Sequence, residues 1–399
     1  MQSSQSPFTQ SELLPQEEML EVTKSKSEMI IGLPKETSGE ENRICLTPDS
    51  VNALTANGHK VYIESKAGVK AGFDDKDYSE VGGMITSDRE KIFACPIVLK
   101  VSPPSFKEIE MLNPQSLLIS ALQLKMRKKD FFQKLAEKRV TALAFEFIKD
   151  EHGDMPAVRA LSEIAGTSSI LIASEILSST AYGNGLMFGN TSGVPPTEVV
   201  ILGAGTVGEF AARATLGLGA NVKVFDSSLT KLRHIQTQLN QQIHTSTLQP
   251  KNLVKALKRA DVLIGAVRGL NRSPVLVTEH MVRQMKKGAV IIDISIDMGG
   301  CVETSEVTSH EDPVFVKHGV IHYGVPNIPS RYARTSSVSI SNMFTPYLLD
   351  IGEKGGIENT LRFDSSLRNG LYFYHGVLTS KSVANWFDLP YRDPNLLIF

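Results

Sequence analysis

Cysteine is scarce in this sequence, with only Cys45, Cys95 and Cys301 among 399 residues. Their number is odd and they lie far apart, so they indicate neither a disulfide framework nor the paired spacing of a zinc site. A reducing compartment fits such a chain better than an oxidising one. We therefore expect a cytoplasmic protein that holds no metal ion.

An excess of charge and a long apolar run are both absent. The chain has 42 Lys and Arg residues against 43 Asp and Glu residues, a net charge of -1. It therefore lacks the basic surface that binds nucleic acid or an anionic membrane. No run of about 18 uninterrupted apolar residues is present to cross a bilayer. Residues 1–27 lack the apolar segment of a signal peptide, and we interpret them as a disordered tail.

What is present is an alternation of short apolar runs and helical patterns, which predicts an α/β fold with mostly parallel sheets. At 399 residues the chain is long enough for two domains. We expect two Rossmann-like domains, a substrate domain from 28–160 and 330–399 and a dinucleotide-binding domain from 161–329. The segment after Pro329 is expected to supply helices that complete the first domain. The expected strands include Met29–Leu33, Lys60–Glu64, Pro96–Val101, Ser116–Ala121, Val140–Phe145, Val199–Leu202, Asp261–Val267, Ala289–Ile294 and Gly319–Tyr323.

A glycine pattern follows the apolar run that ends at Leu202. Gly203, Gly205 and Gly208 form G-x-G-x-x-G. In this pattern the first glycine permits a tight turn, the second lets a pyrophosphate approach, and the third lets a helix pack against the strand. The helix is expected to begin near Thr206, so that its free N–H groups and positive dipole end face the phosphates.

An acid stands where a dinucleotide site needs one. Asp226 ends the next expected strand, about 20 residues after the glycines, where a carboxylate accepts hydrogen bonds from an adenosine ribose. A glycine-rich turn that merely precedes a helix would leave Asp226 unexplained. Strand, turn, helix, second strand and acid together predict a dinucleotide-binding site.

Further polar residues follow expected strands, where parallel α/β sheets bind ligands. Arg43 could offer a planar fork to a substrate carboxylate, but the residues alone favour an ordinary ion pair with a neighbouring glutamate. Asp293, Ser295 and Asp297 alternate with apolar residues, which predicts one strand face that orients an ammonium group or a nicotinamide amide. A solvated face or a capping Asp is the other interpretation. Asn327 could bind a nicotinamide or substrate, or simply form a turn.

Several motifs occur together along residues 28–390. They are the opening Gly-Leu-Pro-Lys-Glu…Asn-Arg-Ile…Thr-Pro, Leu161-Ser-Glu-Ile-Ala-Gly166, the Gly203 motif, Asp261-Val-Leu-Ile-Gly-Ala-Val267, Ile294-Ser-Ile-Asp-Met-Gly-Gly-Cys301 and Val325-Pro-Asn-Ile-Pro329. In these motifs the chain resembles the family of alanine dehydrogenases and the NAD-binding subunit of proton-translocating transhydrogenase. The segments 301–305 and 318–323 are similar to the dehydrogenase branch.

The resemblance implies NAD as the cofactor, a small amino-acid or 2-oxo-acid substrate, and a homo-oligomer, either a hexamer or a dimer. By family position, Arg43 binds the substrate carboxylate, and Asp297 lies beside the nicotinamide and the substrate amine. The residues that it assigns to the cofactor site are Ser162, Gly203, Gly205, Thr206, Val207, Gly208, Asp226, Val267 and Asn327.

Two positions depart from the family pattern. Ser102 stands where the dehydrogenases have a substrate-binding lysine, and Gln123 stands where they have the histidine that transfers a proton. A glutamine amide donates a hydrogen bond to a carbonyl oxygen but cannot exchange a proton. Lys100 lies two residues before Ser102, so on an extended strand both side chains share one face. Lys100 could therefore serve as the acid or base, or it could simply cap the strand.

The sequence thus predicts reversible NAD-dependent oxidative deamination of L-alanine to pyruvate and ammonium. The predicted catalytic residues are Asp297, Gln123 and Lys100, and Arg43 and Ser102 are predicted to bind substrate. One alternative is a dehydrogenase for another amino or imino acid, such as a bulkier one that uses the space left by Ser102 and Gln123. The other is an NAD-binding protein of the same family without catalytic activity.

Overall fold

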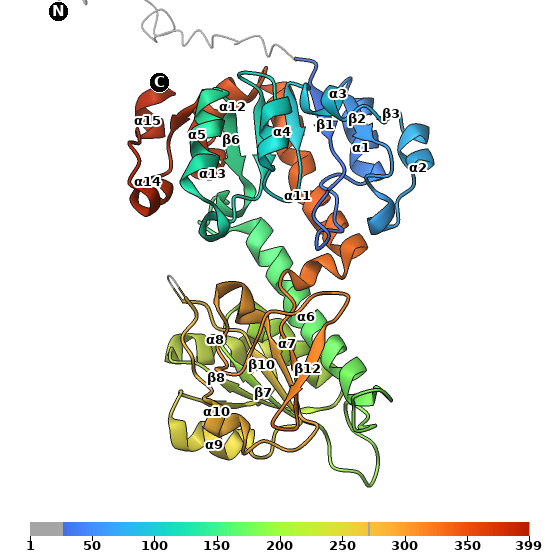
Figure 1. Ribbon diagram of the computed structural model, residues 1–399, viewed down its shortest axis with the longest axis vertical. Helices are drawn as coiled ribbons and strands as arrows, with labels where there is room; N and C mark the ends of the chain where they lie inside the picture. The colour runs from blue at the N-terminus through green and yellow to red at the C-terminus, as the bar shows by residue number, and fades with distance from the viewer. Residues whose placement is uncertain (1–26, 270–271, 399) are drawn as a thin grey trace, which may run out of the picture.

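The computed structural model describes residues 27–269 and 272–398, which form two sheet-centred bodies connected by the long helix α6 (Pro156–Ser178) (Figure 1). The first body holds an eight-stranded sheet and the second a seven-stranded sheet. Helices lie between most successive strands in both bodies, and most strand pairs are parallel, so the expected α/β fold with mostly parallel sheets is confirmed. The division expected at residue 160 falls inside α6, which is continuous there.

The first sheet has the strand order β15-β14-β6-β5-β4-β1-β2-β3. Its six strands from the N-terminal part of the chain are parallel, while β14 runs antiparallel to β6 and pairs with β15 as a hairpin. The central strands are buried on both faces, which explains their continuous apolar runs. The strands are β1 (Ile30–Leu33), β2 (Lys60–Glu64), β3 (Met84–Thr86), β4 (Ile97–Leu99), β5 (Leu117–Ser120), β6 (Thr141–Ala144), β14 (Leu371–Tyr374) and β15 (Val377–Leu378).

The second sheet has the order β12-β13-β11-β10-β7-β8-β9, in which β12 alone is antiparallel to its neighbour. The chain order reverses between β7 and β10, and ligands of open α/β sheets bind at such a point. The strands are β7 (Glu198–Leu202), β8 (Asn221–Phe225), β9 (His244–Ser246), β10 (Val262–Gly265), β11 (Val290–Asp293), β12 (Val314–Lys317) and β13 (Val320–Tyr323).

Helices cover these sheets, and α11 returns from the second body to the first, where it packs against α1 and α12. The other helices are α1 (Pro48–Ala56), α2 (Asp75–Glu80), α3 (Arg89–Phe93), α4 (Phe106–Met111), α5 (Lys129–Glu137), α7 (Thr206–Gly217), α8 (Leu229–Leu239), α9 (Pro250–Leu257), α10 (Glu279–Val282), α11 (Ala333–Glu353), α12 (Ile357–Phe363), α13 (Ser365–Gly370), α14 (Lys381–Phe387) and α15 (Pro394–Leu397). Short 3-10 helices are η2 (Val69–Ala71), η3 (Leu124–Met126), η4 (Phe145–Phe147), η5 (Ile294–Met298) and η6 (Ile328–Ser330).

The helix α6 is long and apolar enough to cross a membrane when only its length and composition are considered. Half of its most apolar window is buried inside the protein, and a core helix passes the same test. Gly166 explains how closely α6 packs on α7, because a Cβ atom there would lie 2.3 Å from the carbonyl oxygen of Val207. The burial of α6 therefore fits a helix that connects the two bodies.

Two parts of the fold differ from the sequence-based expectation. The segment after Pro329 is mostly helical as expected, but it also supplies the hairpin β14–β15, which extends the first sheet beyond β6. The strand expected over Ala289–Ile294 ends at Asp293, and η5 follows it directly. Asp293, Ser295 and Asp297 therefore do not share one strand face, and that prediction was wrong.

Candidate active site

The glycine turn between β7 and α7 has the tight turn at Gly203 and the close helix packing at Gly208 that its sequence predicts. Gly203 has a φ of +105°, and a Cβ atom there would lie 2.3 Å from the carbonyl oxygen of Ala266. At Gly208 a Cβ atom would lie 1.9 Å from the carbonyl oxygen of Gly203, so only glycine lets α7 pack there. Gly205 differs, because a Cβ atom there would meet no other atom within 4 Å. Its open side lies before the N-terminus of α7, at Thr206.

Asp226 reaches back from the end of β8 to this turn. One carboxylate oxygen accepts a hydrogen bond from the backbone N–H of Ala204 at 2.8 Å, and the other accepts one from Ser228 at 2.8 Å. The side chain is buried. Each carboxylate oxygen has a second lone pair, so Asp226 keeps capacity for a further donor such as a ribose hydroxyl.

The turn after β10 borders the glycine turn and is fixed from β11 and η5. The backbone N–H of Val267 donates to Ser295 Oγ at 3.0 Å, and Ser273 Oγ donates to the carbonyl oxygen of Val267 at 2.9 Å. Asp293 is buried and caps η5 and the following turn, accepting from the N–H groups of Ser295 and Cys301 at 3.1 and 3.0 Å. The interpretation of Asp293 as a capping residue therefore holds.

A buried ion pair stands on the first body, in the loop between β1 and α1. Arg43 Nε and Nη2 donate to the two carboxylate oxygens of Glu41 at 2.7 and 2.6 Å, and both side chains are more than nine-tenths buried. Burial opposes both charges, but their mutual attraction outweighs it, so the pKa of Glu41 is lowered and that of Arg43 is raised. Nη1 of Arg43 carries two further donors with which a carboxylate could be bound.

Glu41 also accepts hydrogen bonds from two other predicted site residues. Asn327 Nδ2 donates to Glu41 Oε2 at 3.1 Å, and Ser102 Oγ approaches the same oxygen at 3.5 Å. Asn327 follows β13 of the second sheet, whereas Arg43 and Ser102 follow strands of the first. Three predicted residues from the two bodies thus converge on one carboxylate, that of the neighbouring glutamate which the ion-pair interpretation of Arg43 implied without naming it. Its position two residues before Arg43 was the available signal.

Three serines from the C-terminal part of the chain hold the Glu41 loop in place. Ser330, Ser337 and Ser341 accept hydrogen bonds from the backbone N–H groups of Asn42, Ile44 and Thr47 at 2.9 to 3.0 Å. Ser337 and Ser341 belong to α11. The backbone polar groups of this buried loop are therefore satisfied by residues almost 300 positions away, and the loop conformation depends on the tertiary fold.

Asp297 lies near the end of η5, on the side of Asn327 and Arg43. The backbone N–H of Asn327 hydrogen-bonds to its carboxylate, and the charge of Arg43 acts on it. Asp297 is exposed to solvent on one side, and protein atoms surround its carboxylate on the other. This enclosure raises the pKa of Asp297, and the N–H group and Arg43 oppose the rise only in part. A polar substrate group between Arg43 and Asp297 would meet one positive and one negative partner.

Lys100 is buried just after β4, and its Nζ lies 3.2 Å from a carboxylate oxygen of Glu36 and 3.3 Å from one of Glu108. Glu36 in turn accepts hydrogen bonds from the backbone N–H groups of Val101 and Ser102 at 2.6 and 3.2 Å. The ammonium group of Lys100 therefore supports the turn that carries Ser102. Sequence reasoning missed both glutamates: Glu36 lies far from Lys100 along the chain, and Glu108 lies only eight residues away but on the helix α4, which the fold brings back over the end of β4.

Gln123 and Ser162 occupy other parts of the region. Gln123 has a φ of +48° and an exposed side chain, and its backbone N–H donates to Glu146 Oε1 at 3.0 Å. Ser162 is half-buried on α6. Neither side chain belongs to the hydrogen-bonded group around Glu41, so their predicted contacts with substrate and cofactor stay predictions.

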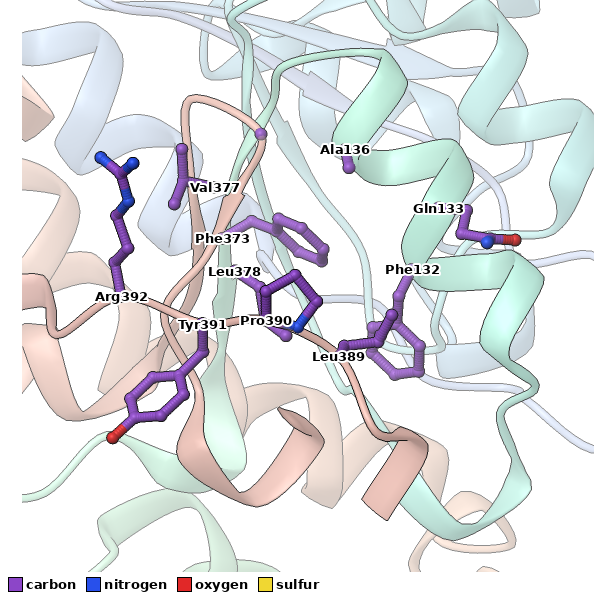
Figure 2. Close-up of a pocket in the computed structure, with 11 residues that line it drawn as sticks. Phe132, Gln133, Ala136, Phe373, Val377, Leu378, Leu389, Pro390, Tyr391 and Arg392 are labelled. Atoms are coloured by element: carbon purple, nitrogen blue, oxygen red, sulfur yellow. The ribbon is translucent and has the colours of Figure 1, made fainter. Parts of the chain in front are cut away.

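One apolar pocket of about 390 Å³ lies elsewhere, between α5 and the C-terminal segment. Figure 2 shows the side chains of Phe132, Phe373, Leu378 and Pro390 around it. None of the residues predicted for the substrate or the cofactor lines this pocket. It therefore offers no alternative place for the chemistry that the sequence predicts.

Comparison with known proteins identifies the family. Residues 32–165 match the family model "Alanine dehydrogenase/PNT, N-terminal domain", and residues 169–381 match the corresponding C-terminal domain. These matches cover most of the chain, which therefore belongs to the alanine dehydrogenase/PNT family.

Individual relatives agree with this membership. The chain is 37% identical to alanine dehydrogenase 2 of Staphylococcus aureus (strain USA300) over 91% of its own length and 98% of the relative. It is 38% identical to alanine dehydrogenase of Staphylococcus haemolyticus (strain JCSC1435), over 91% and 97%. A solved L-alanine dehydrogenase superposes with a TM-score of 0.85 at 34% identity, covering 90% of this chain and 99% of that one. A transhydrogenase from Sinorhizobium meliloti shares the fold, with a TM-score of 0.76 at 21% identity.

Proposed function

We propose that this protein is an NAD-dependent amino-acid dehydrogenase that converts L-alanine, water and NAD to pyruvate, ammonium and NADH, reversibly. The observation that carries the proposal is the hydrogen bond between Asn327 and Glu41. This hydrogen bond joins Asn327 of the second body to the buried Arg43–Glu41 pair of the first, and it supports a substrate site beside the proposed nicotinamide position. The names of the relatives and of the solved L-alanine dehydrogenase support alanine as the substrate.

The second body fits a dinucleotide. Gly205 leaves open space before the N-terminus of α7, where backbone N–H groups and the helix dipole attract phosphates. Asp226 lies beside the same turn with acceptor capacity left for ribose hydroxyls. When bound, NAD supplies the acceptor for the hydride from the substrate carbon. Ser162, Thr206, Val207 and Val267 complete the proposed cofactor site.

NAD is proposed over NADP because of charge. A 2′-phosphate would approach the buried carboxylate of Asp226, and Ser227 and Ser228 follow it where an NADP site has an arginine. Calorimetric titration of the purified protein should therefore show tighter binding of NADH than of NADPH. Tighter binding of NADPH would contradict this assignment.

The first body is proposed to hold the substrate. Arg43 binds the carboxylate through its remaining donors, with Ser102 beside it, and Asp297 orients the amine. Gln123 is proposed to donate a hydrogen bond to the developing carbonyl oxygen. Positioning of this kind brings the substrate carbon and the nicotinamide together in a closing cleft.

The ion pairs of Lys100 support a positioning role in place of direct proton transfer. Its Nζ is held by Glu36 and Glu108, and Glu36 fixes the backbone at Ser102. Under this proposal Lys100 shapes the substrate pocket through Glu36. A homo-oligomeric assembly and a cytoplasmic location are part of the same proposal, and light scattering of the purified protein tests the first.

A panel of amino acids tests the function directly. NADH absorbance is followed with the full chain, NAD and each amino acid in turn, and L-alanine is expected to give the highest kcat/KM. A higher kcat/KM for a bulkier amino acid would reassign the substrate. Binding of NADH without oxidation of any amino acid would eliminate the dehydrogenase activity.

A further inference from the structure

At Gln123, which departs from the family pattern, the backbone hydrogen-bonds to the carboxyl group of Glu146. Gln123 follows β5 in a left-handed turn before η3. The N–H groups of Leu122 and Gln123 both donate to Oε1 of Glu146, at 2.8 and 3.0 Å. Glu146 belongs to η4, at the end of the neighbouring strand β6. A carboxyl group is therefore attached to the turn at which the relatives carry their proton-transferring histidine.

The other oxygen of Glu146 is unusual. Oε2 is buried and has no hydrogen-bond partner among the residues that the structure describes. A buried polar atom without a partner costs about 1–3 kcal/mol, so proteins keep few of them. Oε1 fixes the orientation of the carboxyl group, while Oε2 stays available for a partner that the folded chain does not itself provide.

Charged and titratable groups face Glu146 from both bodies. Burial raises the pKa of Glu146, and the backbone hydrogen bonds and the positive charge of Arg268, in the loop after β10, only partly oppose the rise. Tyr372 of β14 also interacts with Glu146, because burial and the charge of Glu146 raise the pKa of its phenol. Arg127, after η3, acts on Tyr372 in turn. Arg268 places Glu146 at the boundary between the two bodies, where the substrate is proposed to bind.

We propose that Glu146 is the proton-exchanging group of this enzyme, in the role that the histidine has in its relatives. This inference rests on the function proposed above. The geometry that supports it is the anchored Oε1, the unpartnered Oε2 and the attachment to the turn at Gln123. Gln123 then supplies a hydrogen bond, and Glu146 supplies the proton chemistry that an amide cannot perform.

Glu146 can accept and return every proton that moves when the imino acid is hydrolysed to pyruvate and ammonium. Water adds to the carbon of the protonated imino acid, and its proton passes to Oε2 while the C=N electron pair moves to nitrogen. Glu146 returns that proton to the amino group of the carbinolamine. The C–N bond breaks with its electron pair leaving on ammonia, and the hydroxyl proton passes to Oε2 as the C=O bond forms. That proton then joins ammonia as ammonium, which leaves Glu146 ionised again.

Replacement by the isosteric amide tests the role. Glu146→Gln should lower kcat for alanine oxidation about 100-fold or more, the range for loss of a general acid–base group. The NADH dissociation constant, measured by fluorescence titration, should not change. In wild type the rate should fall toward acid pH as Glu146 becomes protonated, and this limb should vanish from the residual rate of Glu146→Gln. Glu151→Gln, on an exposed glutamate nearby, is the matched control and should match wild type.

Rescue separates proton transfer from a structural contribution. Gln123→His in the Glu146→Gln background should restore part of kcat, because an imidazole brings an exchangeable proton to the same turn. A merely structural glutamate would lower the rate equally at every pH and would gain nothing from the histidine. An infrared difference spectrum of wild type minus Glu146→Gln should show a carboxyl group that titrates above the usual glutamate range.

The outcomes distinguish this inference from the proposed function. An active wild type whose rate and pH profile survive Glu146→Gln would overturn the role of Glu146 and leave the dehydrogenase intact. A wild type that is inactive with every amino acid would overturn both. A Glu146 carboxyl that is fully ionised down to the usual glutamate range would overturn the acid–base role, whatever the turnover.

Discussion

The two halves of the candidate site are constructed in different ways. The dinucleotide side is shaped by backbone sterics, with Gly203 and Gly208 packed against carbonyl oxygens and Gly205 left open. The substrate side consists of buried charges, chiefly Arg43 with Glu41 and Lys100 with Glu36 and Glu108. The first side needs the absence of side chains at given positions, whereas the second needs each charge to find its partner.

This difference predicts how substitutions affect each half of the candidate site. A buried charge that loses its partner retains its desolvation penalty, so the ion pairs are sensitive to removal of either member. A glycine that gains a methyl group either collides with its neighbours or fills an empty space, depending on what faces it. Substitutions on the two sides should therefore separate stability, substrate binding and cofactor binding.

The largest effect is expected at Lys100. Lys100→Met leaves Glu36 buried without its cation, while Glu108 keeps its ion pair with Arg89, and such a break costs about 3–5 kcal/mol of stability. Activity should fall as well, because Glu36 no longer fixes the backbone at Ser102. Urea unfolding followed by circular dichroism measures the stability, and NADH absorbance measures the activity.

Lys60→Met is the matched control for Lys100. Lys60 pairs with Glu28 on the surface, where both side chains are half-exposed, and its loss should change neither stability nor activity noticeably. A direct proton-transfer role for Lys100 predicts a different result. Lys100→Met would then also remove one limb of the pH–rate profile, whereas a positioning role leaves the shape of that profile unchanged.

The next largest effect is expected at Arg43. Arg43→Ala removes the proposed anchor of the substrate carboxylate, a loss of about 2–5 kcal/mol that should raise KM for alanine at least tenfold. NADH affinity should stay nearly unchanged, because the glycine turn belongs to the other body. Arg43→Lys keeps the positive charge but loses the bidentate geometry, so its KM for alanine should lie between those of wild type and Arg43→Ala. An unchanged KM in Arg43→Ala would remove Arg43 from the substrate site.

In the second body, the pH dependence of stability can be tested at the buried side chain of His322. Its Nδ1 bonds to the carbonyl oxygen of Val320 at 3.0 Å and its Nε2 to Thr304 Oγ1 at 2.8 Å. Burial lowers the pKa of His322 to about 4, from 6.5 in a model peptide. His322 binds a proton more readily in the unfolded chain than in the folded one. Its contribution to the free energy of unfolding is therefore complete above pH 6.5 and declines as the pH falls toward 4. It amounts to at most about 3 kcal/mol.

The pH effect at His322 is measured as a difference between variants. Unfolding free energies of wild type and His322→Gln are compared at neutral pH and near pH 5, and the wild type should lose more stability on acidification. His280→Gln, on an exposed histidine of α10, should show the wild-type pH dependence. Equal acid sensitivity in all three proteins would show that His322 titrates like an exposed residue.

The smallest effects, and the sharpest contrast, are expected within the glycine motif. Gly208→Ala brings a methyl group to 1.9 Å from the Gly203 carbonyl oxygen and should lower stability by about 1–3 kcal/mol. Gly205→Ala meets no protein atom and should leave stability unchanged, but its methyl group occupies the space proposed for the pyrophosphate. Thermal unfolding and NADH titration of the two variants should therefore give opposite patterns. If both variants bind NADH as tightly as wild type, the proposed cofactor site is wrong.

Much of the fold was predictable from local pattern. The continuous apolar runs at β4, β5, β6 and β7 are typical of parallel strands buried on both faces, and each forms within a residue or two of its expected limits. The hairpin β14–β15 was not predicted, because it lies in the segment after Pro329 that was expected to supply helices; it pairs with β6 at one side of the first sheet. The turn at Asp293 was also missed, because the alternation that suggested a strand is broken by a 3-10 helix.

The sequence by itself determined the dinucleotide side, because the spacing of strand, glycines, helix and acid lies within about 30 residues, and each role follows from local sterics. Only the tertiary structure decided the substrate side. Glu41 became its centre because serines of α11 hold its loop and because Asn327 arrives from the second sheet. Glu146 became a candidate acid because two backbone N–H groups of the turn after β5 orient it. Charges separated by hundreds of residues interact strongly only when folding removes the water between them, and no local pattern records that burial.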